Sequence, residues 1–159
     1  MPTITPYDWT LRPAVPEDVE AVAELRAVVM RADLERLGRY DEHRVRQRLR
    51  DAFLPEHTSV IESGGAFAGC VTLRPGADGW WLENFLLSPA LQGQGHGIGS
   101  AVLRSLLARA DAERLTVRLD VLRGSAARRL YERHGFGLER EDAVDVFLVR
   151  EPVVREATP

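Results

Sequence analysis

The sequence predicts a single α/β domain with a mixed sheet, and three observations lead to this prediction. The chain has 159 residues, which is an ordinary size for one domain. Its apolar content of 45% and charged content of 28% are typical of a globular protein with a buried core. Strand and helix patterns follow one another along the chain. We expect the folded core at about residues 9–150, with frayed ends on either side.

The N-terminal third predicts one strand followed by helices. Residues 9–12 have the pattern of a short first strand. Pro16 marks a helix start, because proline is accommodated in the first turn, and the apolar spacing continues to about Arg31. A second helical region covers residues 33–53, and we expect Gly38 to divide it in two.

The rest of the chain predicts a three-stranded meander and then further strands and helices. Turn residues separate the strands of the meander, which are expected at 58–62, 66–74 and 80–88. The elements that follow are a helix at 99–112, a strand at 115–121, a helix at 125–134 and strands at 137–141 and 144–149. Because such crossovers are right-handed and join parallel strands, strands 80–88 and 115–121 are expected to be parallel.

A glycine-rich loop joins the strand at 80–88 to the helix at 99–112. Every second residue of this loop is glycine, namely Gly93, Gly95, Gly97 and Gly99. Backbone N–H groups at a helix N-terminus are unpaired and carry partial positive charge, so they bind phosphate. Glycine also lets the backbone approach a ligand closely. The loop therefore predicts a phosphate-bearing ligand near residues 97–100.

The residues of the loop exclude two common phosphate-binding motifs. The loop of nucleotide hydrolases requires a lysine, and the chain contains none. The dinucleotide motif G-x-G-x-x-G fails in all three registers, because Ile98, Ser100 or Val102 stands where the third glycine belongs. The absence of lysine also excludes a lysine Schiff base.

The loop resembles the acetyl-CoA loop of GCN5-related N-acetyltransferases (the GNAT family), whose pattern is Q/R-x-x-G-x-G/A. Residues 94–99 match this pattern from Gln94, and the register that begins at Gln92 also satisfies it. The family's ALY…GF signature is present as Arg129-Leu130-Tyr131 followed by Gly135-Phe136. The resemblance covers about residues 11–149.

The resemblance implies a GNAT-like fold, with a mostly antiparallel sheet whose two parallel central strands splay apart to admit pantetheine. Acetyl-CoA would be the cosubstrate, and an acceptor amine would attack its thioester directly in a ternary complex. The residues implied in cofactor binding are Phe85, Leu86, Leu87, Gln92, Gln94, Gly95, His96, Gly97, Ile98, Gly99, Ser100, Ser125 and Arg128.

Three residues are candidates for proton transfer. The resemblance places Tyr131 at the general-acid position, from which a phenol can protonate the leaving thiolate. Glu83 and Asp120 are alternative general bases for the acceptor ammonium. Asp120 stands where some relatives that modify protein N-termini carry glutamate. The Leu87 amide is a candidate donor to the oxyanion.

The acceptor side of the site has three candidate residues. Strand alternation places Trp81 on one face with Glu83, Phe85 and Leu87. Trp80 and Trp81 can wall the acceptor site, and packing in the core explains them at least as well. Glu35 and Arg39 lie between the first helices, which form the acceptor wall in the family. A solvated helix face with pairs of opposite charge explains these two residues equally well.

Composition limits the partners. The net charge of −3 argues against nucleic acid, and no apolar run approaches the ~20 residues that span a membrane. Cys70 is the only cysteine, which excludes an intramolecular disulfide, and His43 and His57 lack metal-ligand spacing. With no signal-peptide pattern at the N-terminus, we expect a cytoplasmic protein without a metal. A homodimer is compatible with the sequence.

Together these features predict an N-acetyltransferase that acts on a primary amine of a small molecule or peptide. Two other functions stay open on the same residues. One is a non-catalytic sensor that binds acyl-CoA, and the other is an enzyme that transfers a longer acyl group. The sequence does not identify the acceptor.

Overall fold

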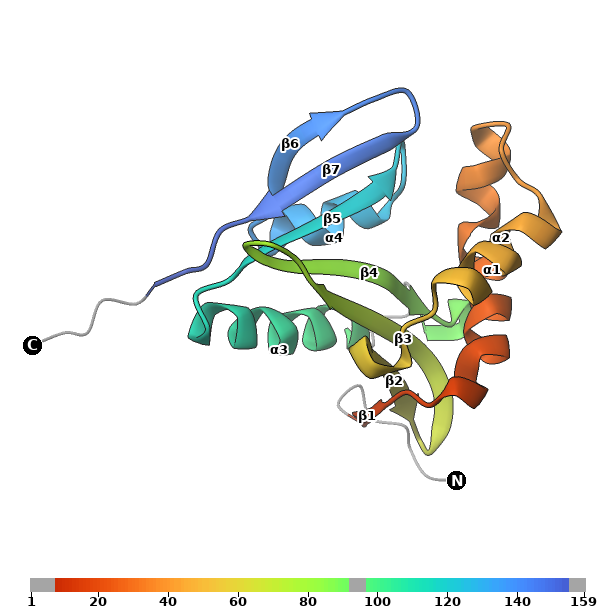
Figure 1. Cartoon of the computed structure of the whole chain (residues 1–159), viewed down its shortest axis with the longest axis horizontal. Coiled ribbons are helices and arrows are strands. Elements are labelled where there is room, and N and C mark those ends of the chain that lie inside the picture. The colour runs from red at the N-terminus through yellow and green to blue at the C-terminus, as the bar shows by residue number, and fades with distance from the viewer. Residues whose placement is uncertain (1–7, 92–96, 155–159) are drawn as a thin grey trace, which may run out of the picture. The chain divides into compact units, whose positions relative to one another are not determined.

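A computed structural model describes residues 8–91 and 97–154 of the chain (Figure 1). Seven strands form one mixed sheet in the order β1-β2-β3-β4-β5-β7-β6, so the predicted α/β fold is confirmed. The chain divides into two compact units. The first unit is Met1–Leu73 with Glu83–Gly99, and the second is Arg74–Leu82 with Ser100–Pro159. Strand β4 (Gly79–Leu87) and helix α3 (Ile98–Ala112) run from one unit into the other.

The first unit contains antiparallel strands and two helices. Its strands are β1 (Trp9–Pro13), β2 (Thr58–Ser63) and β3 (Ala66–Pro75), which continues into the second unit. Strand β2 pairs antiparallel with both β1 and β3, and the hairpin of β2 with β3 is the one that the turn residues predicted. The helices are α1 (Val19–Arg36) and α2 (Glu42–Ala52). Short 3-10 turns occupy Pro16–Asp18, Pro55–His57 and Pro89–Leu91.

Helix α1 is longer than the sequence pattern predicted. We expected it to end near Arg31, but it continues to Arg36, so that prediction is wrong. Ion pairs one turn apart support the added turn, because Arg31 binds Glu35 at 2.6 Å and Arg36 binds Asp33 at 2.7 Å. The break at Gly38 is confirmed: its φ of +69° lies in the left-handed region that glycine adopts readily.

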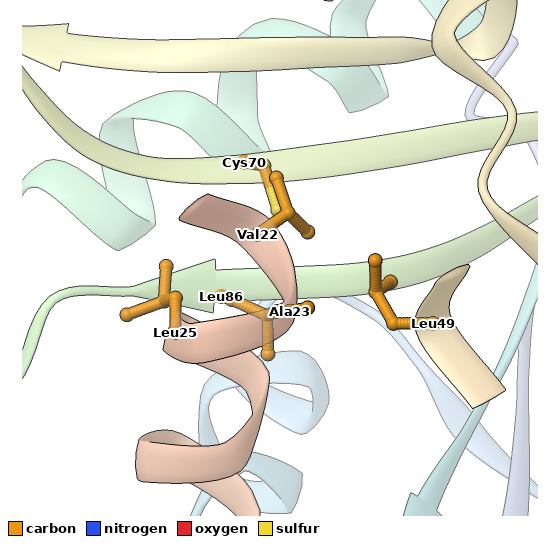
Figure 2. Close-up of a cluster of buried hydrophobic side chains, with 6 residues drawn as sticks. All are labelled: Val22, Ala23, Leu25, Leu49, Cys70 and Leu86. Atoms are coloured by element: carbon orange, nitrogen blue, oxygen red, sulfur yellow. The ribbon is translucent and has the colours of Figure 1, made fainter. Parts of the chain in front are cut away.

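Helices α1 and α2 pack on the strands of the first unit through one apolar cluster (Figure 2). The cluster comprises Val22, Ala23 and Leu25 of α1, Leu49 of α2, Cys70 of β3 and Leu86 of β4. Two ion pairs also join the helices, from Arg46 to Glu24 at 2.8 Å and from Arg50 to Glu20 at 2.9 Å. The position of α1 is thereby fixed against the strands that carry Cys70 and Leu86.

The second unit contains the predicted parallel strand pair. The start of β4, Gly79–Trp81, pairs in parallel with Thr116–Arg118 of β5 (Thr116–Leu122). Helix α4 (Ala127–Arg133) follows, and then strands β6 (Gly137–Glu141) and β7 (Asp145–Arg150). Strand β7 pairs antiparallel with both β5 and β6. The sheet is therefore mixed, with mostly antiparallel pairs among the registers described.

A partly buried ion pair, between buried Arg150 and half-buried Asp111, ties α3 to β7 in the second unit. Arg150 donates two hydrogen bonds to the Asp111 carboxylate, at 2.8 and 3.0 Å, and its Nε donates to the His134 carbonyl oxygen at 3.1 Å. The Val153 amide also donates to Asp111, at 2.9 Å. The pKa of Asp111 is held below its usual range, mainly by the hydrogen bonds from Arg150.

Candidate functional site

Strand β4 is distorted at Asn84, whose φ of 46° lies in the left-handed region. A left-handed residue within a strand redirects the backbone that follows it, and such distortions are common beside active sites. Asparagine accepts this conformation more readily than most residues. We refer to Glu83–Phe85 as the Asn84 kink. The regular alternation that we predicted to place Trp81, Glu83 and Leu87 on one face is interrupted there.

Side chains from α1 and β3 contact the Asn84 kink. Arg26 donates from Nη1 to the Asn84 Oδ1 at 2.7 Å, and the Cys70 thiol donates to the Asn84 carbonyl oxygen at 3.3 Å. Burial raises the pKa of Cys70 to about 12, against smaller opposing effects of a Leu86 backbone hydrogen bond and of the Arg26 charge. The thiol therefore stays protonated at neutral pH and serves as a hydrogen-bond donor.

The backbone beyond the kink lies very close to β3. A Cβ atom added at Gly69 would collide with the Leu86 carbonyl oxygen, so only glycine allows this approach. The Ser88 amide donates to the Ala68 carbonyl oxygen at 2.8 Å. Of the three β4 residues that the resemblance implies in cofactor binding, Leu86 is buried, whereas Phe85 and Leu87 are half-buried.

Helix α3 begins directly after Gly97, as the glycine loop predicted. Gly97 is exposed, its φ is +64°, and a Cβ added there would meet no atom within 4 Å. Ile98, Gly99 and Ser100 form the first turn, whose N–H groups have no partner within the helix. Gln92, Gln94, Gly95 and His96 lie outside the described residues. Both registers of the loop therefore stay open.

Tyr131 lies in α4 and is 6% exposed. Its ring packs edge-on against Phe136, with the centroids 5.6 Å apart. Burial raises the pKa of the phenol, and the negative charge of Asp120 on β5 raises it further. The structure thus brings together two of the three candidates for proton transfer. At neutral pH the phenol holds its proton.

Two of the remaining second-unit candidates, Ser125 and Arg128, lie just before and within the first turn of α4, and the third, Trp81, lies in β4. The Ser125 hydroxyl accepts a hydrogen bond from the Ala127 amide at 3.2 Å, while the residue that directly precedes α4 is Ala126. Arg128 is half-buried and binds Glu132, one turn on, at 3.5 Å. Trp81 is half-buried at the start of β4, with the Arg74 guanidinium 5.9 Å from its ring centroid.

Of the two candidates expected between the first helices, only Arg39 lies there; Glu35 belongs to α1, which continues to Arg36, so its expected position is wrong. Glu35 is exposed and binds Arg31, as the solvated helix face predicted. Arg39 is exposed in the turn after α1. Glu83 is half-buried beside Asn84.

Within residues 8–91 and 97–154, no three His, Cys, Asp or Glu side chains gather as metal ligands.

Sequence reasoning missed Asn84 and Arg26. Asparagine is depleted in strands and enriched at left-handed positions, so its presence inside an apolar strand pattern was a usable signal. Arg26 had no such signal, because its contact with Asn84 joins residues 58 positions apart.

Comparison with known proteins gives the family. The model of the acetyltransferase (GNAT) family matches residues 20–136, and the chain belongs to this family. The predicted resemblance is therefore confirmed. None of the curated proteins matches the chain.

In the part of the chain that the structure describes, no helix is both long and apolar enough to cross a bilayer.

Solved structures share the fold. A PaiA N-acetyltransferase from Thermoplasma acidophilum, in complex with coenzyme A, has a TM-score of 0.72 and 19% identity, covering 90% of this chain and 98% of that one. An N-acetyltransferase from Staphylococcus aureus Mu50 has a TM-score of 0.67 and 19% identity, covering 88% and 99%. An N-acetylglutamate synthase from Neisseria gonorrhoeae, complexed with coenzyme A and L-arginine, has a TM-score of 0.60 and 22% identity, covering 91% and 33%.

Proposed function

We propose that the protein transfers an acetyl group from acetyl-CoA to a primary amine of a small molecule or peptide. The observation that carries this proposal is the GNAT family match over residues 20–136. The match includes residues of both units, which supports the proposal that the chain acts as one acetyltransferase domain. Coenzyme A in two of the similar structures supports the choice of cosubstrate.

The start of α3 fits a phosphate-bearing ligand. Its first-turn N–H groups have no partner within the helix, and the space at Gly97 is open. We propose that amides from the loop to Ser100 hold the pyrophosphate, and that backbone groups of Phe85–Leu87 bond to pantetheine. Acetyl-CoA supplies the activated acyl group, while these residues orient it.

The amine is proposed to attack the thioester directly, without an acetylated enzyme. A route through an acetylated enzyme needs a reactive side-chain nucleophile. A lysine amine cannot serve, because the chain has no lysine. The only cysteine, Cys70, is 0% exposed and its pKa is raised to about 12. A buried, protonated thiol is a poor nucleophile. These features favour a ternary complex of enzyme, acetyl-CoA and amine.

The proposed proton transfers use the candidates described above. An acceptor ammonium must lose a proton before its nitrogen can bond to the carbonyl carbon, and Glu83 or Asp120 takes that proton directly or through water. The Leu87 amide donates to the oxyanion. As the carbon–sulfur bond breaks, Tyr131 gives its phenolic proton to the thiolate. The raised pKa of Tyr131 keeps this proton in place until then.

Release of coenzyme A thiol in the presence of a panel of amines, amino acids and peptides tests the proposal. Amine-dependent release, with a product heavier by one acetyl group, supports it. Binding of acetyl-CoA without release for any acceptor would favour the sensor function. Faster turnover of a longer acyl-CoA than of acetyl-CoA would favour the other alternative. Reactions without amine give the background of thioester hydrolysis.

A further inference from the structure

We infer that Arg26 is a positioning residue for acetyl transfer, acting through the Asn84 kink. The inference rests on the proposed function, because it concerns the backbone proposed to meet the acyl group. Arg26 lies in α1, 58 residues before Asn84, and donates to its side-chain oxygen at 2.7 Å. Hydrogen bonds from a charged donor are stronger than those between neutral groups.

The kink depends on its surroundings. A left-handed residue inside an extended strand persists only where neighbouring groups hold it there. Arg26 holds the Asn84 side chain, and the Cys70 thiol donates to the Asn84 carbonyl oxygen. Both donors come from elements of the first unit that pack together, so the two contacts act on one residue from a common support.

Helix α1 gives Arg26 a fixed base. Its neighbours in the helix, Leu25 and Ala27, are 8% and 2% exposed. Leu25 belongs to the apolar cluster that also contains Cys70 and Leu86 (Figure 2). A side chain on a packed helix holds its partner more accurately than one on a loop. Arg26 therefore fixes Asn84 relative to the strands.

The consequence falls on the residues that follow Asn84. The conformation at Asn84 sets the direction of the backbone at Phe85–Leu87, which is proposed to bond to pantetheine and the oxyanion. Misplacing a reacting group by about 1 Å can cost about 10² in rate. The pyrophosphate is held elsewhere, at the start of α3. Loss of the Arg26 contact should therefore lower kcat more than it changes the KM for acetyl-CoA.

Steady-state kinetics of Arg26→Gln test this role. We expect kcat to fall about tenfold or more, with the KM for acetyl-CoA within about twofold of wild type. Arg26→Lys, which keeps the charge and a donor, should recover part of the loss. Arg46→Gln is the matched control, because it removes an arginine that binds Glu24 on α1 without changing Arg26. A loss of kcat equal to that of the control would overturn the inference.

A double-mutant cycle tests whether Arg26 acts through Asn84. Asn84→Gly permits the left-handed backbone but removes the side chain that Arg26 binds. Arg26→Gln should then have little further effect in the Asn84→Gly background. An equal loss of kcat in both backgrounds would show that Arg26 acts by another route.

Amide hydrogen exchange separates this inference from the proposed function. Arg26→Gln should speed exchange at residues 83–88 and leave β5 unchanged, and unchanged exchange at 83–88 would overturn the positioning role. Wild-type protein without amine-dependent thiol release would instead contradict the proposed function. Melting temperatures check that each variant is folded.

Discussion

Replacing Gly69 with alanine tests whether β3 must approach the backbone beyond the Asn84 kink as closely as the structure shows. The added Cβ would collide with the Leu86 carbonyl oxygen. A backbone oxygen cannot rotate away as the end of a side chain can, so β3 or β4 must shift. We expect the variant to be less stable than wild type and to turn over more slowly.

The magnitude follows from two opposing effects. Forcing extra atoms into a packed interior costs about 1–3 kcal/mol. Alanine also restricts the unfolded chain more than glycine, which stabilises the folded state by about 0.4–1 kcal/mol. Because Gly69 is buried between strands, we expect a net loss of about 2 kcal/mol in the free energy of unfolding. For a chain of this length, that lowers Tm by about 4–8 °C.

Thermal unfolding of Gly69→Ala beside Gly137→Ala measures this effect. Gly137 is also in a strand, but a Cβ there would meet no atom within 4 Å. The control should therefore melt at or above the wild-type temperature, since it keeps the gain from the unfolded state without a collision. Equal Tm values for the two variants would refute the close approach of β3 to Leu86.

Three further predictions concern proton transfer and stability. Tyr131→Phe should lower kcat about tenfold or more with little change in acetyl-CoA affinity, and a rate within about twofold of wild type would exclude Tyr131 as the acid. Glu83→Gln and Asp120→Asn, made as separate variants, should flatten the rise of rate with pH in only one of the two. Equal pH–rate profiles for both variants would indicate that the amine is deprotonated through water. Asp111→Asn should cost about 2 kcal/mol at pH 7 by weakening the bonds from Arg150. Because the folded-state pKa of Asp111 is lowered, wild type loses this advantage as the pH falls below about 4, so denaturant titrations of both proteins should converge there.

Much of the fold could be predicted from local patterns. Turn residues and alternation located the meander, and strand β6 was predicted at its observed bounds, Gly137–Glu141. The parallel pairing of β4 with β5 followed from the handedness of crossovers. The end of α1 was missed because ion pairs on the helix surface add a turn, and these leave no apolar pattern.

Less of the candidate site than of the fold could be predicted from the sequence. The glycine before α3 and the buried tyrosine of α4 belong to motifs that are contiguous in sequence. The Asn84 kink depends instead on contacts that Arg26 and Cys70 make from distant parts of the chain. No local pattern encodes such contacts, because they arise only when α1 and β3 pack against β4.

The most direct test of the account is the affinity of the protein for acetyl-CoA, measured by titration calorimetry on wild type, Gly97→Glu and Gly64→Glu. Gly64 is the matched control, because its φ of +59° and open surroundings resemble those of Gly97. If the start of α3 holds the pyrophosphate, wild type and Gly64→Glu bind alike, and Gly97→Glu binds about tenfold or more weakly because its carboxylate repels phosphate. Equal affinity for Gly97→Glu and wild type would contradict the account.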